Sequence, residues 1–212
     1  MRGTPPLRVR VARDAGSVRR VAELFREYAA GLGFPLDFQD FEEELQRLPG
    51  PYAPPGGTLL LSEFKGELAG CVGLRPLDSH TCEMKRLYVR PGCRGFGVGR
   101  RLVERVVEEG RSKGYRRMRL DTVPRMIEAI ALYRRFGFSE IPAYRFNPIP
   151  GALFFELRLQ QKGGRRPIRA KNPPARRGEG SVPPSESAGP SGSPPPRHGM
   201  APRGSDGSPA HR

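Results

Sequence analysis

The residues best suited to chemistry lie in a loop where glycine alternates with other residues, Arg94-Gly95-Phe96-Gly97-Val98-Gly99. Glycines lack a Cβ atom, so the backbone can turn tightly and successive amide N–H groups can point at one anion. A helix is predicted to begin at the end of this loop, and the positive end of its macrodipole would lie at the same place. Arg94, Arg100 and Arg101 add positive charge. This pattern predicts a binding site for a phosphate or pyrophosphate.

The elements on either side of the loop determine where such an anion would be held. Residues 84–89 form an apolar run that predicts a strand, and Pro91-Gly92 ends it. After the loop, Leu102, Val103, Val106 and Val107 recur at helical spacing. The sequence therefore predicts a strand, a glycine loop and a helix in that order.

The remaining elements follow from hydrophobic periodicity and turn residues. Alternation or apolar runs predict strands at residues 7–11, 58–64, 67–74, 81–89, 116–121, 138–141 and from 152 to 159. Helical spacing predicts helices at residues 18–28, 37–48 and 125–136 besides the one after the loop. Strands come first as a meander and later alternate with helices. We therefore predict an α/β domain with a mixed, mostly antiparallel central sheet and helices on both faces.

Composition divides the chain into a folded domain and a tail. Residues 162–212 contain almost no apolar side chains and are rich in Pro, Gly and Ser, so they cannot bury enough surface to fold. Of the formal net charge of +15, this tail holds ten Lys and Arg against three acidic residues. We predict a domain at residues 1–161 and a disordered basic tail at 162–212. Such a tail suits nucleic acid or an acidic surface, although many only aid solubility.

The cysteines and the apolar runs exclude several classes of protein. Cys71, Cys82 and Cys93 are odd in number and form no CxxC pair, so we predict neither a disulfide framework nor a metal site. No apolar run reaches membrane-spanning length, and the N-terminus lacks the apolar core of a signal peptide. Reduced thiols and these absences favour a cytoplasmic protein without a membrane partner.

Two segments resemble a known family, the GNAT superfamily of acyl-CoA-dependent N-acetyltransferases. RLYVRPGCRGFGVGRRL at residues 86–102 is similar to the family's acyl-CoA motif, an Arg or Gln followed by x-x-Gly-x-Gly or Ala. ALYRRFGF at residues 131–138 is similar to its signature on the helix and strand after the cofactor site. The resemblance covers residues 7–159. Because nucleotide P-loops and Rossmann proteins also use glycine loops, the second segment makes the match specific.

The resemblance implies acetyl-CoA as acetyl donor and a set of residues that hold it. The strand backbone would pair with the pantetheine arm, an N–H near Leu87 would polarise the acetyl carbonyl, and the loop amides would hold the pyrophosphate. The implied cofactor-binding residues are Leu87, Tyr88, Val89, Arg94, Gly95, Phe96, Gly97, Val98, Gly99 and Arg100. Met126 stands where many members have an Asn that contacts the cofactor.

The resemblance also implies two catalytic residues. An amine with a pKa of about 10.4 costs roughly 4.6 kcal/mol to deprotonate at pH 7, so the reaction needs a base. Glu83, at the start of the strand before the loop, is the candidate base, and a solvated charge at the strand end is the alternative. Tyr133 is the candidate acid that protonates the leaving thiolate. The alternative for Tyr133 is a core aromatic whose hydroxyl is bonded to the backbone.

We therefore predict an N-acetyltransferase that moves the acetyl group of acetyl-CoA directly to an amine of a small molecule or peptide. A non-catalytic acyl-CoA-binding regulatory module and a nucleic-acid-associated protein acting through the basic tail are the alternatives. A homodimer is left open. Segments 31–57 and 142–151 would shape the acceptor pocket, with Tyr28, Phe34 and Tyr52 as candidate lining residues.

Overall fold

The computed structural model describes residues 7–34, 36 and 40–159. Its elements in chain order are β1 (Leu7–Val11), α1 (Ala15–Gly31), α2 (Phe41–Gln46), β2 (Thr58–Phe64), β3 (Glu67–Pro76), β4 (Thr81–Val89), α3 (Val98–Ser112), β5 (Arg117–Thr122), α4 (Ile127–Arg135), β6 (Ser139–Ile141) and β7 (Leu153–Arg158). Short 3-10 turns at Gly50–Tyr52 and Pro91–Cys93 complete the described part.

The strands form one sheet in the order β1-β2-β3-β4-β5-β7-β6. Every described pair is antiparallel except β4 with β5. The β2–β3 hairpin turns at Lys65 and Gly66, which both have positive φ (57° and 84°), as a two-residue turn of the favoured type requires. The predicted mixed, mostly antiparallel sheet is confirmed.

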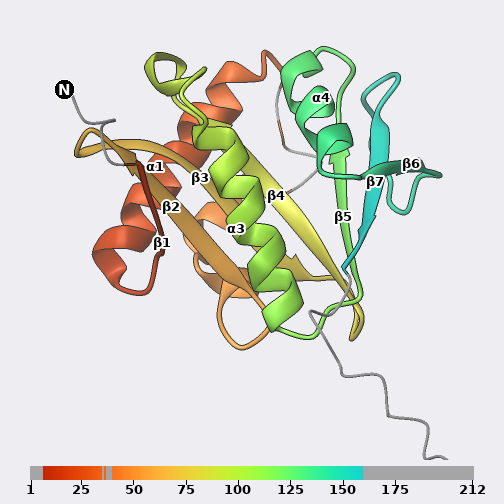
Figure 1. Cartoon of the computed structure of the whole chain (residues 1–212), viewed down its shortest axis with the longest axis horizontal. Helices are drawn as coiled ribbons and strands as arrows, with labels where there is room; N and C mark the ends of the chain where they lie inside the picture. Colours follow the sequence, from red (N-terminus) through yellow and green to blue (C-terminus); the bar gives the residue numbers. More distant parts are fainter. Residues whose placement is uncertain (1–6, 35, 37–39, 160–212) are drawn as a thin grey trace, which may run out of the picture. The chain divides into compact units, whose positions relative to one another are not determined.

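Helices cover both faces of this sheet (Figure 1). On one face α3 packs Leu102, Val103 and Val106 into a core shared with β2 to β5, β7 and α4. On the other face α1 and α2 pack against the opposite side of β2 and β3. Asp14 caps α1 through a hydrogen bond of 2.8 Å from the amide of Ser17, in a reciprocal capping box.

Most predicted elements are present, with bounds shifted by at most three residues. For the second predicted helix, 37–48, α2 runs from Phe41 to Gln46 and so ends two residues early, while positions 37–39 lie outside the described residues. Its Phe41 and Leu45 are buried as the periodicity indicated. The predicted tail at 162–212 lies outside the described residues. No helix among the described residues is both long and apolar enough to span a membrane.

A β-bulge in β4 is the irregularity that matters for function. Pairing with β3 runs from Cys71↔Tyr88 to Gly73↔Lys85, so two residues, Arg86 and Leu87, lie opposite the single Val72. Arg86 has φ of 56°, a left-handed conformation that a long side chain rarely adopts. The bulge therefore interrupts the alternation of side chains along β4.

Candidate functional site

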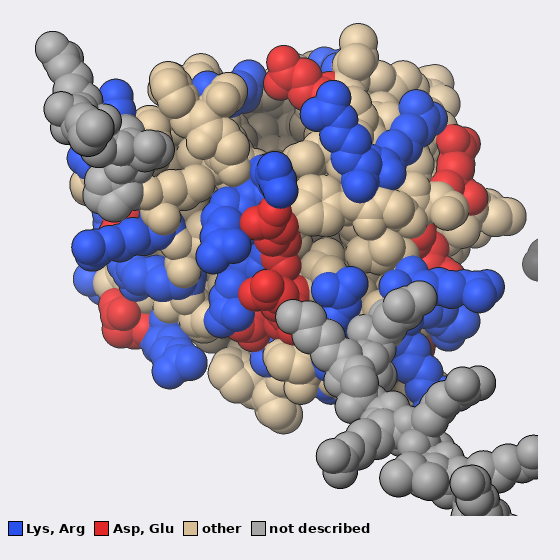
Figure 2. All heavy atoms as spheres, viewed as in Figure 1, with Lys and Arg blue, Asp and Glu red and all other residues tan. Residues whose placement is uncertain are grey.

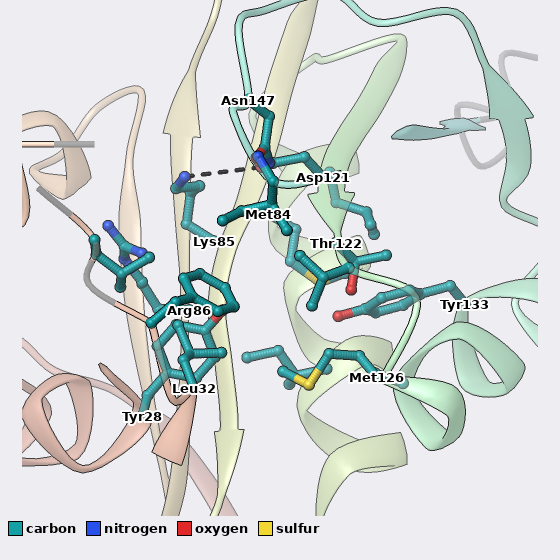
Figure 3. A pocket seen from close by; sticks show the side chains of 17 residues that line it. Tyr28, Leu32, Met84, Lys85, Arg86, Asp121, Thr122, Met126, Tyr133 and Asn147 are labelled. Carbon is teal, nitrogen blue, oxygen red and sulfur yellow. Dashed lines mark hydrogen bonds and ion pairs between the residues drawn. The ribbon is translucent and has the colours of Figure 1, made fainter. Parts of the chain in front are cut away.

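The site lies where β4 and β5 separate. These parallel strands pair only at Thr81↔Arg117, Cys82↔Met118 and Glu83↔Arg119. Beyond Glu83 the two strands diverge, and a pocket with a cavity volume of about 60 Å³ lies between them. Figure 3 shows this pocket. Its lining comes from α1 and the segment after it, from β4, β5 and α4, and from the segment before β7: Tyr28, Leu32, Phe34, Leu36, Met84, Lys85, Arg86, Leu87, Leu120, Asp121, Thr122, Val123, Met126, Ala129, Tyr133, Asn147 and Ile149.

The glycine loop ends in a helix N-terminus that has no side-chain cap. Gly97 is the N-cap of α3 with φ of 80°, and no side chain accepts a hydrogen bond from the first turn. The first backbone hydrogen bond of α3 is donated by Arg101 to the carbonyl of Gly97. The amides of Val98, Gly99 and Arg100 therefore have no acceptor within the helix. Added Cβ atoms at Gly95 and Gly97 would meet nothing within 4 Å, so the loop faces open space. These features fit the pyrophosphate of a CoA ester.

The arginines of this region are engaged within the protein. Arg94 donates from Nε to the carbonyl of Val89 at 3.1 Å, and Arg100 pairs with Glu104 at 2.9 Å. Figure 2 shows a row of acidic side chains beside Lys and Arg side chains over α3, and a hollow near its N-terminal end. The exposed ring of Phe96 stacks on Phe64 with 5.0 Å between centroids. The loop amides, more than the arginine side chains, are therefore available to an anion.

The strand residues predicted to hold the pantetheine arm lie along the gap. Leu87 lines the pocket. Tyr88 faces α1, where its ring contacts that of Tyr28. A Cβ on Gly99 would lie 3.6 Å from Cγ2 of Val89, so the end of β4 adjoins the start of α3. Since β5 pairs with β4 only up to Glu83, the backbone of Leu87 to Val89 has no strand partner on that side.

Tyr133, for which the resemblance implied the role of acid, lines the pocket. Its ring packs against Phe138 and Phe155, and its hydroxyl points into the space between β4 and β5 (Figure 3). The hydroxyl forms no hydrogen bond within the described ranges, which argues against a role in bonding the backbone. Burial raises the pKa of Tyr133 above its ordinary value of 10. The phenol therefore keeps its proton at neutral pH.

Glu83 lies beside the pocket but does not line it. It is fully buried and accepts from Arg75 at 2.8 Å, from the hydroxyl of Tyr144 at 2.7 Å and from Arg145 at 3.1 Å. Burial alone would raise the pKa of Glu83, but the charges of Lys85 and Arg75 outweigh it and leave the pKa below its ordinary value. Its predicted role as base stays a prediction, and the geometry shows a carboxylate that joins β3, β4 and the segment before β7.

A second carboxylate, Asp121, does line the pocket. It lies near the end of β5, accepts a hydrogen bond of 2.9 Å from Asn147 and lies 3.8 Å from Nζ of Lys85. Burial lowers the pKa of Lys85 to about 8, although the charges of Glu83 and Asp121 oppose this effect. Figure 3 shows Lys85, Asp121 and Asn147 together at one end of the pocket.

Arg86 forms part of the pocket wall and is anchored from behind. Its Nε and Nη2 contact the carboxylate of Glu44, and its guanidinium lies 5.0 Å from the ring centroid of Phe41. Glu44 also accepts from the hydroxyl of Tyr52. Burial raises the pKa of Glu44, but the hydrogen bond and charge of Arg86 outweigh it, so the net shift is downward.

Sequence reasoning placed some pocket residues and missed others. Tyr28 and Phe34 line the pocket as expected, whereas Tyr52 is buried in the core. Lys85, Arg86 and Asp121 were missed. The available signal was the pair of consecutive cations inside an otherwise apolar strand, because Lys and Arg are rarely buried unless they are paired with another group.

Comparison with known proteins places this geometry among acetyltransferases. Residues 19–138 match the family model described as the acetyltransferase (GNAT) family. An uncharacterized N-acetyltransferase of Schizosaccharomyces pombe is 37% identical over 140 residues, which is 65% of this chain and 86% of that protein. An IAA acetyltransferase of Azospirillum brasilense is 33% identical, over 71% of this chain and 98% of the relative.

Solved structures show the same fold. A GNAT-family acetyltransferase of Staphylococcus aureus superposes with a TM-score of 0.61 at 20% identity, covering 73% of this chain and 100% of the other. The Salmonella typhimurium protein yncA, solved with its cofactor acetyl-CoA, gives a TM-score of 0.54 at 22% identity, covering 73% and 95%.

The ion-pair cluster of Glu83 predicts a pH dependence of stability. Because its pKa is depressed in the folded state, its contribution is present above the ordinary value of 4.5 and is lost as pH falls below it. We expect Glu83→Gln to lower the free energy of unfolding by roughly 3 kcal/mol at neutral pH. Between about pH 5 and pH 3 the variant should lose less stability than the native protein. Urea unfolding at a series of pH values measures both, and parallel curves would contradict the role of this cluster.

Proposed function

Since the chain belongs to the acetyltransferase (GNAT) family, which uses acetyl-CoA, we propose that it moves the acetyl group of acetyl-CoA directly to an amine of a small molecule or peptide. One observation carries this proposal: the hydroxyl of Tyr133 points into the gap between β4 and β5, and the uncapped start of α3 adjoins Val89 of β4 and Leu132 of α4. A module that only binds acyl-CoA would need the helix N-terminus but not the tyrosine.

The residues supply positioning and proton transfer, because the thioester of the donor is already activated. The first amides of α3 hold the pyrophosphate, and the unpaired backbone of β4 orients the pantetheine arm. An N–H near Leu87 stabilises the oxyanion that forms as the amine nitrogen attacks the carbonyl carbon. The carbon–sulfur bond breaks, and Tyr133 gives its proton to the leaving sulfur. The proton lost by the amine nitrogen passes to a carboxylate.

Asp121 is better placed than Glu83 to be the carboxylate that accepts this proton. Asp121 lines the pocket, whereas Glu83 is surrounded by three protein donors. A proton can reach Asp121 directly or through one water molecule. We therefore add Asp121 to the candidates for the base.

The two carboxylates can be separated by matched amide variants. We expect Asp121→Asn to lower kcat/KM at neutral pH by about 10²-fold or more, with the loss shrinking as pH rises toward the pKa of the free amine. Glu83→Gln should show no such recovery, after correction for the folded fraction. A pH-rescued loss in Glu83→Gln alone would make Glu83 the base, as the sequence predicted.

Loss of the Tyr133 hydroxyl should affect the chemical step and not donor binding. We expect Tyr133→Phe to lower kcat about 10²-fold or more while the Kd for acetyl-CoA changes less than about threefold. Tyr115→Phe is the matched control, because the hydroxyl of Tyr115 bonds the carbonyl of Gly56 and does not line the pocket. Steady-state thiol release and calorimetric binding measure the two quantities. Unchanged kcat would remove the acid role.

The uncapped N-terminus of α3 gives a test of donor binding. Gly97→Asp places a carboxylate at the N-cap, where it bonds the first-turn amides and repels a pyrophosphate. We expect the Kd for acetyl-CoA to rise at least about tenfold. Gly97→Asn tests the same left-handed backbone without the charge, and Asn is tolerated there. Equal affinities for the two variants would contradict an anion seat at this position.

A further inference from the structure

The wall of the pocket formed by β4 has two adjacent cationic side chains. In a regular strand Lys85 and Arg86 would point to opposite faces of the sheet. The bulge and the positive φ of Arg86 break that alternation, and both residues line the same pocket. Left-handed backbone at a residue with a long side chain costs on the order of 1 kcal/mol and persists only where its surroundings fix it.

The guanidinium of Arg86 is held in place at the pocket wall. Nε and Nη2 contact Glu44, and the rings of Phe41 and Tyr28 lie 5.0 and 5.9 Å from the guanidinium carbon. The guanidinium also forms a side-chain hydrogen bond with Tyr28, another residue of the pocket lining. Glu44 offsets the charge of Arg86 from outside the pocket lining. An anion in the pocket would therefore meet a preorganised donor that needs little reorganisation to bind it.

The opposite wall is acidic. Asp121 on β5 faces the pocket with Asn147 beside it, and Lys85 lies 3.8 Å from its carboxylate. Figure 3 shows Arg86 across the pocket from Tyr133, with Asp121 on the β5 side. An amine bound near Asp121 would therefore have its remaining substituents directed toward β4 and α1. A second positive charge on the acceptor would meet Arg86 and Lys85.

We propose that the acceptor is a small amine that bears a carboxylate, such as an amino acid, with the amine against Asp121 and the carboxylate against Arg86. The inference rests on the proposed acetyltransferase function and specifies its substrate class. Charge complementarity on both walls favours an acceptor with one group of each sign over a polyamine.

The decisive experiment compares acceptors that differ only at the carboxylate, using the full native chain. Each of several amino acids is tested beside its carboxamide and its decarboxylated amine, and a polyamine is included. Thiol release from acetyl-CoA gives kcat/KM for each. We expect the amino acids to exceed both partners by about tenfold to a hundredfold. The carboxamide has the more easily deprotonated amine, so a preference for the acid cannot arise from amine reactivity.

Variants of Arg86 test whether this residue causes the preference for acceptors that bear a carboxylate. Arg86→Gln should reduce the ratio of kcat/KM between acid and carboxamide toward one, and Arg86→Lys should retain part of it. Arg90→Lys is the matched control, because Arg90 follows β4, pairs with Glu27 on α1 and does not line the pocket. An unchanged ratio in folded Arg86→Gln would overturn the assignment to Arg86.

The outcomes separate this inference from the proposed function. Thiol release with carboxamides, simple amines or polyamines at rates equal to those with amino acids would overturn the inference and leave the acetyltransferase function standing. Acetyl-CoA binding without thiol release for any acceptor would overturn the proposed function, and the inference with it. The native-protein comparison decides the substrate class even if the Arg86 variants do not fold.

Discussion

The pairing between β4 and β5 lasts for three residue pairs and ends after Glu83, and the geometry of the site depends on this limit. Backbone donors and acceptors that leave a strand ladder must find other partners, because burying them unpaired is costly. In this chain the gap is bordered by the start of α3 and by α4. A donor molecule with an extended amide-containing arm and a pyrophosphate can form hydrogen bonds both with the unpaired backbone of β4 and with the first amides of α3. The same gap admits the hydroxyl of Tyr133.

Two charged clusters hold the strands on either side of that gap. Glu83 joins Arg75 of β3 to Tyr144 and Arg145 in the segment before β7, and so fixes the point at which the strands separate. Glu44 of α2 holds Arg86 at the bulge and bonds Tyr52 as well. Buried ion pairs of this kind add little net stability compared with apolar packing. Their value here lies in placing specific groups at a defined position, which is what binding and proton transfer require.

The described part of the fold could be read from the sequence to within a few residues at most element ends. Alternation in β1 and helical spacing in α1 and α3 each mark one buried face. Each of these two periods is compatible with only one type of secondary structure. The second helix was predicted to continue to Leu48, because Leu48 fits the period, whereas α2 ends at Gln46. Periodicity shows which side chains face inward and leaves helix ends to local capping.

The sequence by itself determined the glycine loop and the helix that follows it, because these depend on local spacing along one strand, one loop and one helix. Tyr133 was singled out by its place in a segment that resembles a family signature. Only the tertiary structure decided which charged residues meet in the pocket. Glu83 and Lys85 lie two residues apart on β4, yet Glu83 points into an ion-pair cluster and Lys85 lines the pocket. Arg86 at the bulge, Asp121 and Asn147 meet at the pocket although they lie up to about sixty positions apart in the sequence. No local pattern encodes such contacts, because they form only when the strands are paired and their register is fixed.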